Sequence, residues 1–164
     1  MIDDGRPSET ETERADRNFG ELLQELRVAQ TGVQILFAFL LTIPFQARFD
    51  QLDGAQRGVL LASLIFAACA AACLIAPVAY HRILFRLRMK DYIVKITNRY
   101  ALAGLGFLVL AVTSALMVAL SEIVPQWEAV GFALGIGLVF LMLWLVLPLT
   151  RRARLREEDR DELG

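Results

Sequence analysis

Side chains that bind metals or perform acid–base catalysis are scarce in this 164-residue sequence. It contains one histidine, His81, and two cysteines, Cys69 and Cys73, which are spaced one helical turn apart. Two thiols cannot complete a four-ligand zinc site, and two cysteines on one turn are poorly placed for a disulfide. The sequence also lacks a nucleotide-binding loop and a recognisable nucleophile–base motif. It therefore predicts no metal site, no cofactor, no catalytic residues and no enzymatic activity.

Charged side chains are missing from four long stretches, which lie at residues 28–47, 58–80, 100–121 and 129–150. An α-helix needs about 20 apolar residues to cross a hydrocarbon core of roughly 30 Å, and every stretch is at least that long. A membrane-spanning backbone must satisfy its own hydrogen bonds as a helix or a closed barrel, and no barrel-like alternation occurs. We predict an all-α protein, a polytopic membrane four-helix bundle over residues 28–150.

Carboxylates are absent from these four stretches as well. Proton- and sodium-coupled transporters typically carry such groups, or broken helices, near the middle of the membrane. This absence argues against coupled transport.

Basic residues are concentrated on one side of the predicted topology. The N-terminal segment, residues 81–99 and the tail 151–164 contain four, six and five of them, which is 15 of the 17. Only Arg48 and Arg57 fall on the other side. Because cytoplasmic loops are enriched in Lys and Arg, we predict a multi-pass cell-membrane protein with both termini in the cytoplasm.

The N-terminal 27 residues divide into two predicted parts. Residues 1–9 are polar and acidic, which favours disorder. Residues 10–27 show the pattern of an amphipathic cytoplasmic helix, whose apolar stripe we define as the docking face. The docking face consists of Phe19, Leu22, Leu23 and Leu26. Such a helix lies on the membrane or caps the bundle in one interpretation, and binds a partner protein in the other.

Residues 81–99 form a predicted cytoplasmic hairpin that is strongly basic. Its basic side chains are His81, Arg82, Arg86, Arg88, Lys90, Lys95 and Arg99. Formal charges are +5 for this hairpin and −5 for residues 1–26. We hypothesise that the docking face packs on the hairpin; in the rival hypothesis the hairpin binds anionic lipid headgroups.

A polar stripe enters the first predicted span. Arg27, Gln30, Thr31 and Gln34 are spaced i, i+3, i+4 and i+7, which places them on one helix face. Polar groups in a membrane usually face other helices or a wet cavity. One interpretation is hydrogen bonding between helices, and the other is a vestibule for a ligand or an ion.

Pairs of glycines mark predicted close contacts between helices. Gly131 and Gly135 form a GxxxG pattern, with Gly137 beyond it, and Gly104 and Gly106 resemble it in the third span. Small residues let helices approach closely, either within one chain or between copies.

The run from Asn18 to Phe49 resembles an uncharacterised family of small four-span bacterial membrane proteins, mostly from actinobacteria. The segment HRILFRLRMK and the glycine-rich third span are similar to it too. The resemblance implies the topology and a bacterial inner-membrane location, and no functional residues.

Together these features predict a non-enzymatic scaffold or accessory subunit with a cytoplasmic interaction face. The alternative is a small oligomeric channel or transporter that uses the polar face of the first span. The expected partners are the lipid bilayer, anionic headgroups at the hairpin, and a second copy or another membrane protein. We expect no nucleic acid partner.

Overall fold

The computed structural model describes residues 11–84, 90–151 and 154, and the regular structure in that part of the chain is entirely helical. Four long helices follow one another: α1 (Glu11–Thr42), α2 (Gly54–Leu84), α3 (Lys90–Ser121) and α4 (Gln126–Leu141). A π-helical turn, Met142–Val146, extends α4 toward Arg151. Two 3-10 turns, Ile43–Phe45 and Phe49–Gln51, lie between α1 and α2. The predicted all-α class is confirmed.

Each long helix contributes a segment long and apolar enough to cross a membrane. These segments are Gln24–Phe45, Gly54–Tyr80, Ile96–Ser121 and Gln126–Arg151. Large apolar side chains cover their outer surfaces, as with Phe39 and Phe132, which are 72% and 57% exposed. Soluble proteins rarely expose apolar surface on this scale. The number of apolar helices agrees with the number of uncharged stretches, and it indicates a multi-pass membrane protein.

Helix α1 runs without a break through Arg27 and Val28, where the sequence separates the amphipathic helix from the first span. Its 32 residues correspond to about 48 Å at 1.5 Å per residue, which exceeds a hydrocarbon core of roughly 30 Å. The helix ends at Thr42, before the predicted limit at Ala47. Pro44 accounts for this end because it lacks the N–H that a continuing helix needs. The acidic segment 1–9 and most of the tail 151–164 lie outside the described residues.

The first turn of α2 is capped by its own sequence. The Asp53 carboxylate accepts a hydrogen bond from the Gln56 backbone N–H at 2.8 Å, and the Asp53 N–H donates to the Gln56 side chain at 2.9 Å. This reciprocal pair satisfies two donors that a helix start leaves open. Arg57 then donates to the Asp50 carbonyl at 3.0 Å and covers the Phe49 ring. The link between α1 and α2 is thereby held against α2.

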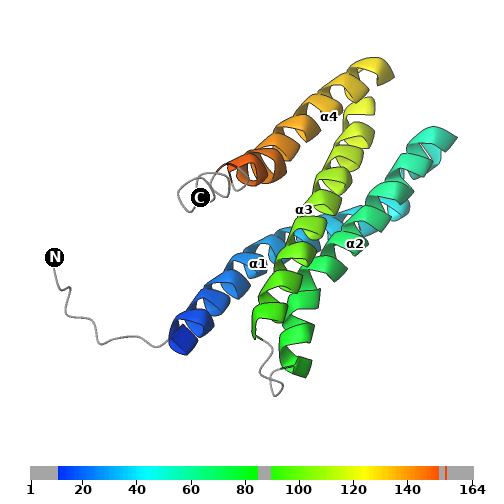
Figure 1. Cartoon of the computed structure of the whole chain (residues 1–164). Coiled ribbons are helices and arrows are strands. Elements are labelled where there is room, and N and C mark those ends of the chain that lie inside the picture. The colour runs from blue at the N-terminus through cyan, green and yellow to red at the C-terminus, as the bar shows by residue number, and fades with distance from the viewer. Residues whose placement is uncertain (1–10, 85–89, 152–153, 155–164) are drawn as a thin grey trace.

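Helices α2 and α3 form an antiparallel pair (Figure 1). Hydrogen bonds of 2.9–3.3 Å join them near both ends and in the middle, at Gln56–Ser121, Ser63–Ala111 and Tyr80–Tyr100. Between these bonds the helices approach closely at Gly104, where a Cβ atom would lie only 2.8 Å from two carbons of Leu74. Glycine therefore permits the contact. This pair is the centre of the molecule, and α1 packs across it through buried Leu26, Val33 and Leu40.

Helix α4 packs differently from the other three. In the described residues its backbone approaches α3 and not α1 or α2. Figure 1 shows α4 leaving the α3–α4 link at an angle to α2 and α3. Its contact face is the buried series Ala129, Ala133 and Gly137, with Gly137 against Thr113 of α3. The predicted glycine pair is not used here, since Gly131 and Gly135 are exposed with open space around them. The arrangement is a three-helix core with α4 on one side.

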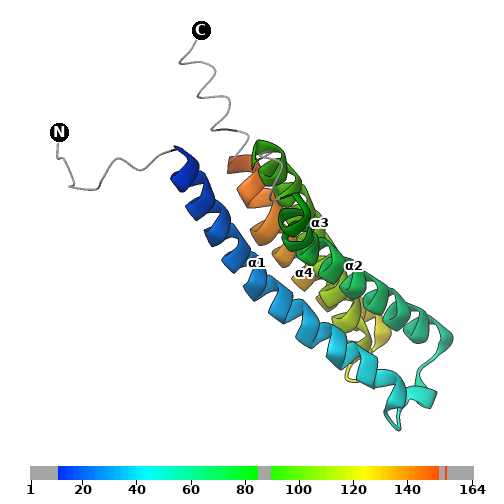
Figure 2. The same ribbon diagram turned by 90° about the horizontal axis from the view of Figure 1, so that it is seen from below.

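The helix ends gather into two sets (Figure 2). The start of α1, the end of α4 and the neighbouring ends of α2 and α3 lie at one end of the molecule. The α1–α2 and α3–α4 links lie at the other. Of the described basic residues, Arg17, Arg82 and Arg151 belong to the first set, whereas Arg48 and Arg57 belong to the second. The charge asymmetry of the described residues therefore corresponds to two ends of the folded chain.

Candidate functional site

The polar stripe of α1 divides between two environments. Gln30 is half-buried, and its Nε2 donates to the Leu74 carbonyl of α2 at 2.6 Å. Thr31 is exposed and its hydroxyl donates to the Arg27 carbonyl of its own helix at 3.0 Å. Arg27 and Gln34 are exposed as well. Gln30 thus lies at the edge of the stripe nearest α2, and the other three side chains face away from the molecule.

The hydrogen bond from Gln30 ends on α2 close to a proline inside that helix. Pro77 is fully buried inside this helix and lacks the N–H that would bond the Cys73 carbonyl. Its ring also crowds the preceding turn, which contains Leu74. In membranes, neighbouring helices compensate for such prolines by bonding nearby backbone groups. The sequence placed Pro77 and Gln30 on separate spans and offered no signal that Gln30 bonds the turn before Pro77.

Gln34 has no comparable partner among the described residues. It lies ten residues after the start of the apolar segment Gln24–Phe45, close to its middle. An amide that stays unpaired in hydrocarbon costs several kcal/mol. Gln24, Arg27, Thr31 and Gln34 are all exposed and recur at intervals of three or four residues; we call them the α1 outer strip. Sequence reasoning missed Gln24 because it precedes the uncharged stretch.

Of the four side chains in the docking face, the structure describes only that of Leu26. Leu26 is 7% exposed and belongs to a buried cluster with Val33, Leu74 and Leu108. The side chains of Phe19, Leu22 and Leu23 lie outside the described part of the structure. Docking on the hairpin stays a prediction, and Leu26 packs within the helix core.

The structure describes only the part of the basic hairpin that adjoins the apolar segments. Helix α2 ends at Leu84 and α3 begins at Lys90. Residues 85–89, which include Arg86 and Arg88, lie outside the described residues, and so do the side chains of His81, Lys90 and Lys95. Arg82 and Arg99 are exposed. The Tyr80 and Tyr100 rings pack with centroids 5.6 Å apart and their hydroxyls are 3.3 Å apart. This contact holds the two helices together where they leave the apolar segments.

Metal-binding clusters are absent from the described residues, where no three His, Cys, Asp or Glu side chains gather. Cys69 and Cys73 are free thiols that are partly buried. They occupy the apolar part of α2.

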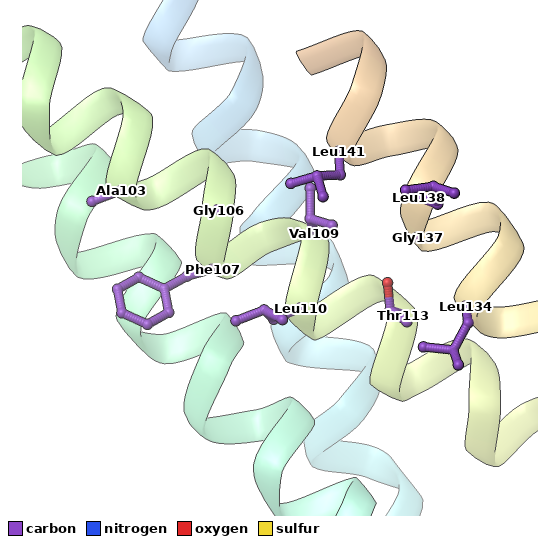
Figure 3. A pocket seen from close by; sticks show the side chains of 10 residues that line it. All are labelled: Ala103, Gly106, Phe107, Val109, Leu110, Thr113, Leu134, Gly137, Leu138 and Leu141. Atoms are coloured by element: carbon purple, nitrogen blue, oxygen red, sulfur yellow. The ribbon is translucent and has the colours of Figure 1, made fainter. Parts of the chain in front are cut away.

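A groove of about 630 Å³ separates α3 from α4 (Figure 3). Ala103, Gly106 and Leu110 line it from α3, and Leu134, Leu138 and Leu141 from α4. Carbon atoms form nearly all of its surface, so it offers no path for a polar solute. Of the predicted glycine pair Gly104 and Gly106, only Gly106 lines this groove, whereas Gly104 packs against Leu74. The sequence predicts helix contacts at both positions and no groove.

The sequence was compared with protein families, curated proteins and solved structures. Residues 8–148 match a family described as a family of unknown function (DUF6328). No curated protein and no solved structure matches the chain.

Proposed function

The chain belongs to the DUF6328 family of unknown function, and we propose that it is a non-enzymatic membrane scaffold or accessory subunit. Its partner is another membrane protein, which binds along the α1 outer strip. The observation that carries this proposal is Gln34, an exposed amide near the middle of an apolar segment. Since such an amide is stable only when it is hydrogen bonded, a partner helix supplies the missing groups.

The shape of α1 supports an interaction face that extends into the cytoplasm. Thirteen residues, Glu11 to Leu23, precede its apolar segment and add about 20 Å of helix. Arg17 and Glu21 are exposed there and lie within 3.9 Å of each other, which suits a water-facing surface. Because α1 is continuous, the α1 outer strip extends from the cytoplasm to the middle of the membrane on one rigid element. The two termini lie in the cytoplasm and the membrane is the bacterial inner membrane in this proposal.

The neighbouring contacts favour a subunit over a channel. Gln30, which would line a vestibule, is engaged with the α2 backbone at 2.6 Å. The groove between α3 and α4 is apolar. Neither feature provides a polar path, although a ring of chains with Gln34 at its axis would form one. Crosslinking from position 34 distinguishes that homo-oligomer from a complex with a different protein.

Site-specific photo-crosslinking in native membranes tests the proposal. A benzophenone amino acid replaces Gln34 in one variant and Phe39 in a matched control, which is 72% exposed and lies on the other flank of α1. We expect a discrete adduct with a different protein from position 34 and none from position 39. An adduct at twice the chain mass alone indicates the channel-like oligomer, and no protein adduct from either position overturns both models.

A second measurement tests whether the Gln34 amide is needed to bind the partner. Gln34→Leu removes the polar group and shortens the side chain by one bond, whereas Gln34→Asn shortens it by the same amount but keeps the amide. We expect the crosslinked partner to co-purify with wild type and Gln34→Asn, and to be lost with Gln34→Leu. Equal recovery with all three proteins would contradict the assigned role of Gln34.

A further inference from the structure

The groove between α3 and α4 is made by small residues on one face of α3. Ala103 and Gly106 leave it open, and a Cβ atom added to Gly106 would meet no atom within 4 Å. The opposite side of α3 carries Leu108, which is buried with Leu26 and Val33 of α1. The groove therefore opens away from α1, toward the lipid that surrounds the apolar segments (Figure 3).

Arg99 lies in line with this groove. It precedes Ala103, Gly106 and Leu110 by four, seven and eleven residues, which places all four on one face of α3. Arg99 is exposed, and no described carboxylate pairs with it. Its Cα lies about 6 Å beyond that of Ala103, and helical side chains lean toward the N-terminus of their helix. The guanidinium is thus directed away from the apolar groove and toward the interface at the hairpin end.

The dimensions of the groove fit one leaflet of a bilayer. From Ala103 to Thr113 the α3 wall contains eleven residues and rises by about 15 Å, which is half of a hydrocarbon core of roughly 30 Å. At its far end α4 closes on α3 where Gly137 meets Thr113. The site therefore combines an apolar channel of one-leaflet length with a cation at its interfacial end.

We propose that this groove binds an anionic glycerophospholipid of the cytoplasmic leaflet, with one acyl chain between α3 and α4 and the phosphate on Arg99. Apolar lining suits the acyl chain, and the single cation selects the anionic headgroup. An interfacial basic residue contributes about 1 kcal/mol toward anionic lipid, which corresponds to a roughly fivefold preference. The inference is independent of the partner proposed for α1, since it concerns the opposite side of α3.

Native mass spectrometry of the purified full-length protein tests this site. Dioleoylphosphatidylglycerol and dioleoylphosphatidylcholine are compared, because they share acyl chains and differ in headgroup charge. We expect one tightly retained lipid per chain and about fivefold preference for phosphatidylglycerol. Glycerol 3-phosphate, which has the phosphate without acyl chains, should not displace it; displacement would show a free-phosphate site instead and overturn the proposal.

Two variants separate the acyl-chain site from the headgroup site. Gly106→Phe fills the groove and should abolish retention of both lipids, while Gly131→Phe, at an equally open glycine outside the groove, should leave it unchanged. Arg99→Gln should retain a lipid but lose the fivefold preference. Ala103→Leu repeats the groove test with a smaller change, should Gly106→Phe fail to fold. Wild-type retention in the groove variants, or unchanged preference in Arg99→Gln, would overturn the proposal. Dissociation of a wild-type dimer on filling the groove would also overturn it, because a second copy would then be the occupant.

Discussion

Helix contacts in this protein depend on a few side chains that are either very small or polar. In lipid there is little hydrophobic force between helices, so close packing and hydrogen bonds decide where they meet. Gly104 permits contact with Leu74, and Ser63 donates to the Ala111 carbonyl from a fully buried position. Substitutions at these contacts should therefore cost more than the same substitutions on the lipid-facing surface.

Gly104→Ala provides the sharpest test of close packing. Its new methyl group would lie 2.8 Å from Leu74, which is fully buried, so one of the two helices or the Leu74 side chain must shift. We expect the free energy of unfolding to fall by about 1–3 kcal/mol, as for other overpacked cores. Unfolding in mixed micelles, followed by far-UV circular dichroism, measures this. Gly135→Ala is the matched control: its Cβ meets open space, so stability should hold or rise by up to about 1 kcal/mol. Equal destabilisation of both variants would refute the assigned contact.

Gln30→Leu tests the bond between α1 and α2. The substitution keeps the side-chain bulk but removes the donor to the Leu74 carbonyl. We expect a loss of about 1 kcal/mol in the same unfolding measurement, the usual value for such bonds in membranes. Gln34→Leu, whose side chain has no described partner, should not lower the stability of the isolated protein.

At the scale of the elements, two prolines explain where the helices deviate from uniform spans. Pro44 ends α1 before the uncharged stretch is over, whereas Pro77 stays inside a continuous α2. The difference lies in the surroundings. Pro44 enters an exposed link, while Pro77 is buried next to a neighbouring helix that supplies a hydrogen-bond donor one turn away.

A double-mutant cycle of Pro77→Ala and Gln30→Leu tests this compensation. If Gln30 stabilises the turn that Pro77 disturbs, restoring the backbone N–H at position 77 should make Gln30 less important. We expect Gln30→Leu to cost at least about 0.5 kcal/mol less in the Pro77→Ala background, as for coupled neighbours. Strict additivity of the two substitutions would show that the bond and the proline act independently.

The whole molecule has two chemically different ends and an open side. The set of helix ends that contains the start of α1 and the end of α4 (Figure 2) includes the described basic residues Arg17, Arg82, Arg99 and Arg151. Of the two basic residues at the other end, Arg57 is already engaged with the Asp50 carbonyl. This asymmetry supports the proposed orientation. The open side, between α3 and α4, is where lipid can enter the fold.

Cysteine labelling tests the orientation. In a Cys69→Ala and Cys73→Ala background, Glu21→Cys reports on the start of α1 and Glu122→Cys on the α3–α4 link, and both residues are exposed. We expect a membrane-impermeant maleimide to label Glu122→Cys in intact spheroplasts, and Glu21→Cys only after permeabilisation. The reverse pattern would invert the topology. Labelling of both before permeabilisation would place the two residues on one side, and it would exclude the three crossings expected between them.

The sequence by itself determined the helical class and the number of apolar helices. Both follow from local properties, because uncharged stretches of sufficient length have few stable alternatives in lipid. Only the tertiary structure decided which polar or small residues meet. The sequence assigned Gln30 and Gln34 to one polar face. In the structure Gln30 forms a hydrogen bond with α2, whereas Gln34 faces outward. The sequence also indicated three glycines in the fourth span, yet only Gly137 contacts α3, beside Ala129 and Ala133, while Gly131 and Gly135 face outward. Rotation of each helix about its axis depends on the shape of its neighbours, and periodicity within one nearly uniformly apolar helix carries almost no information about it.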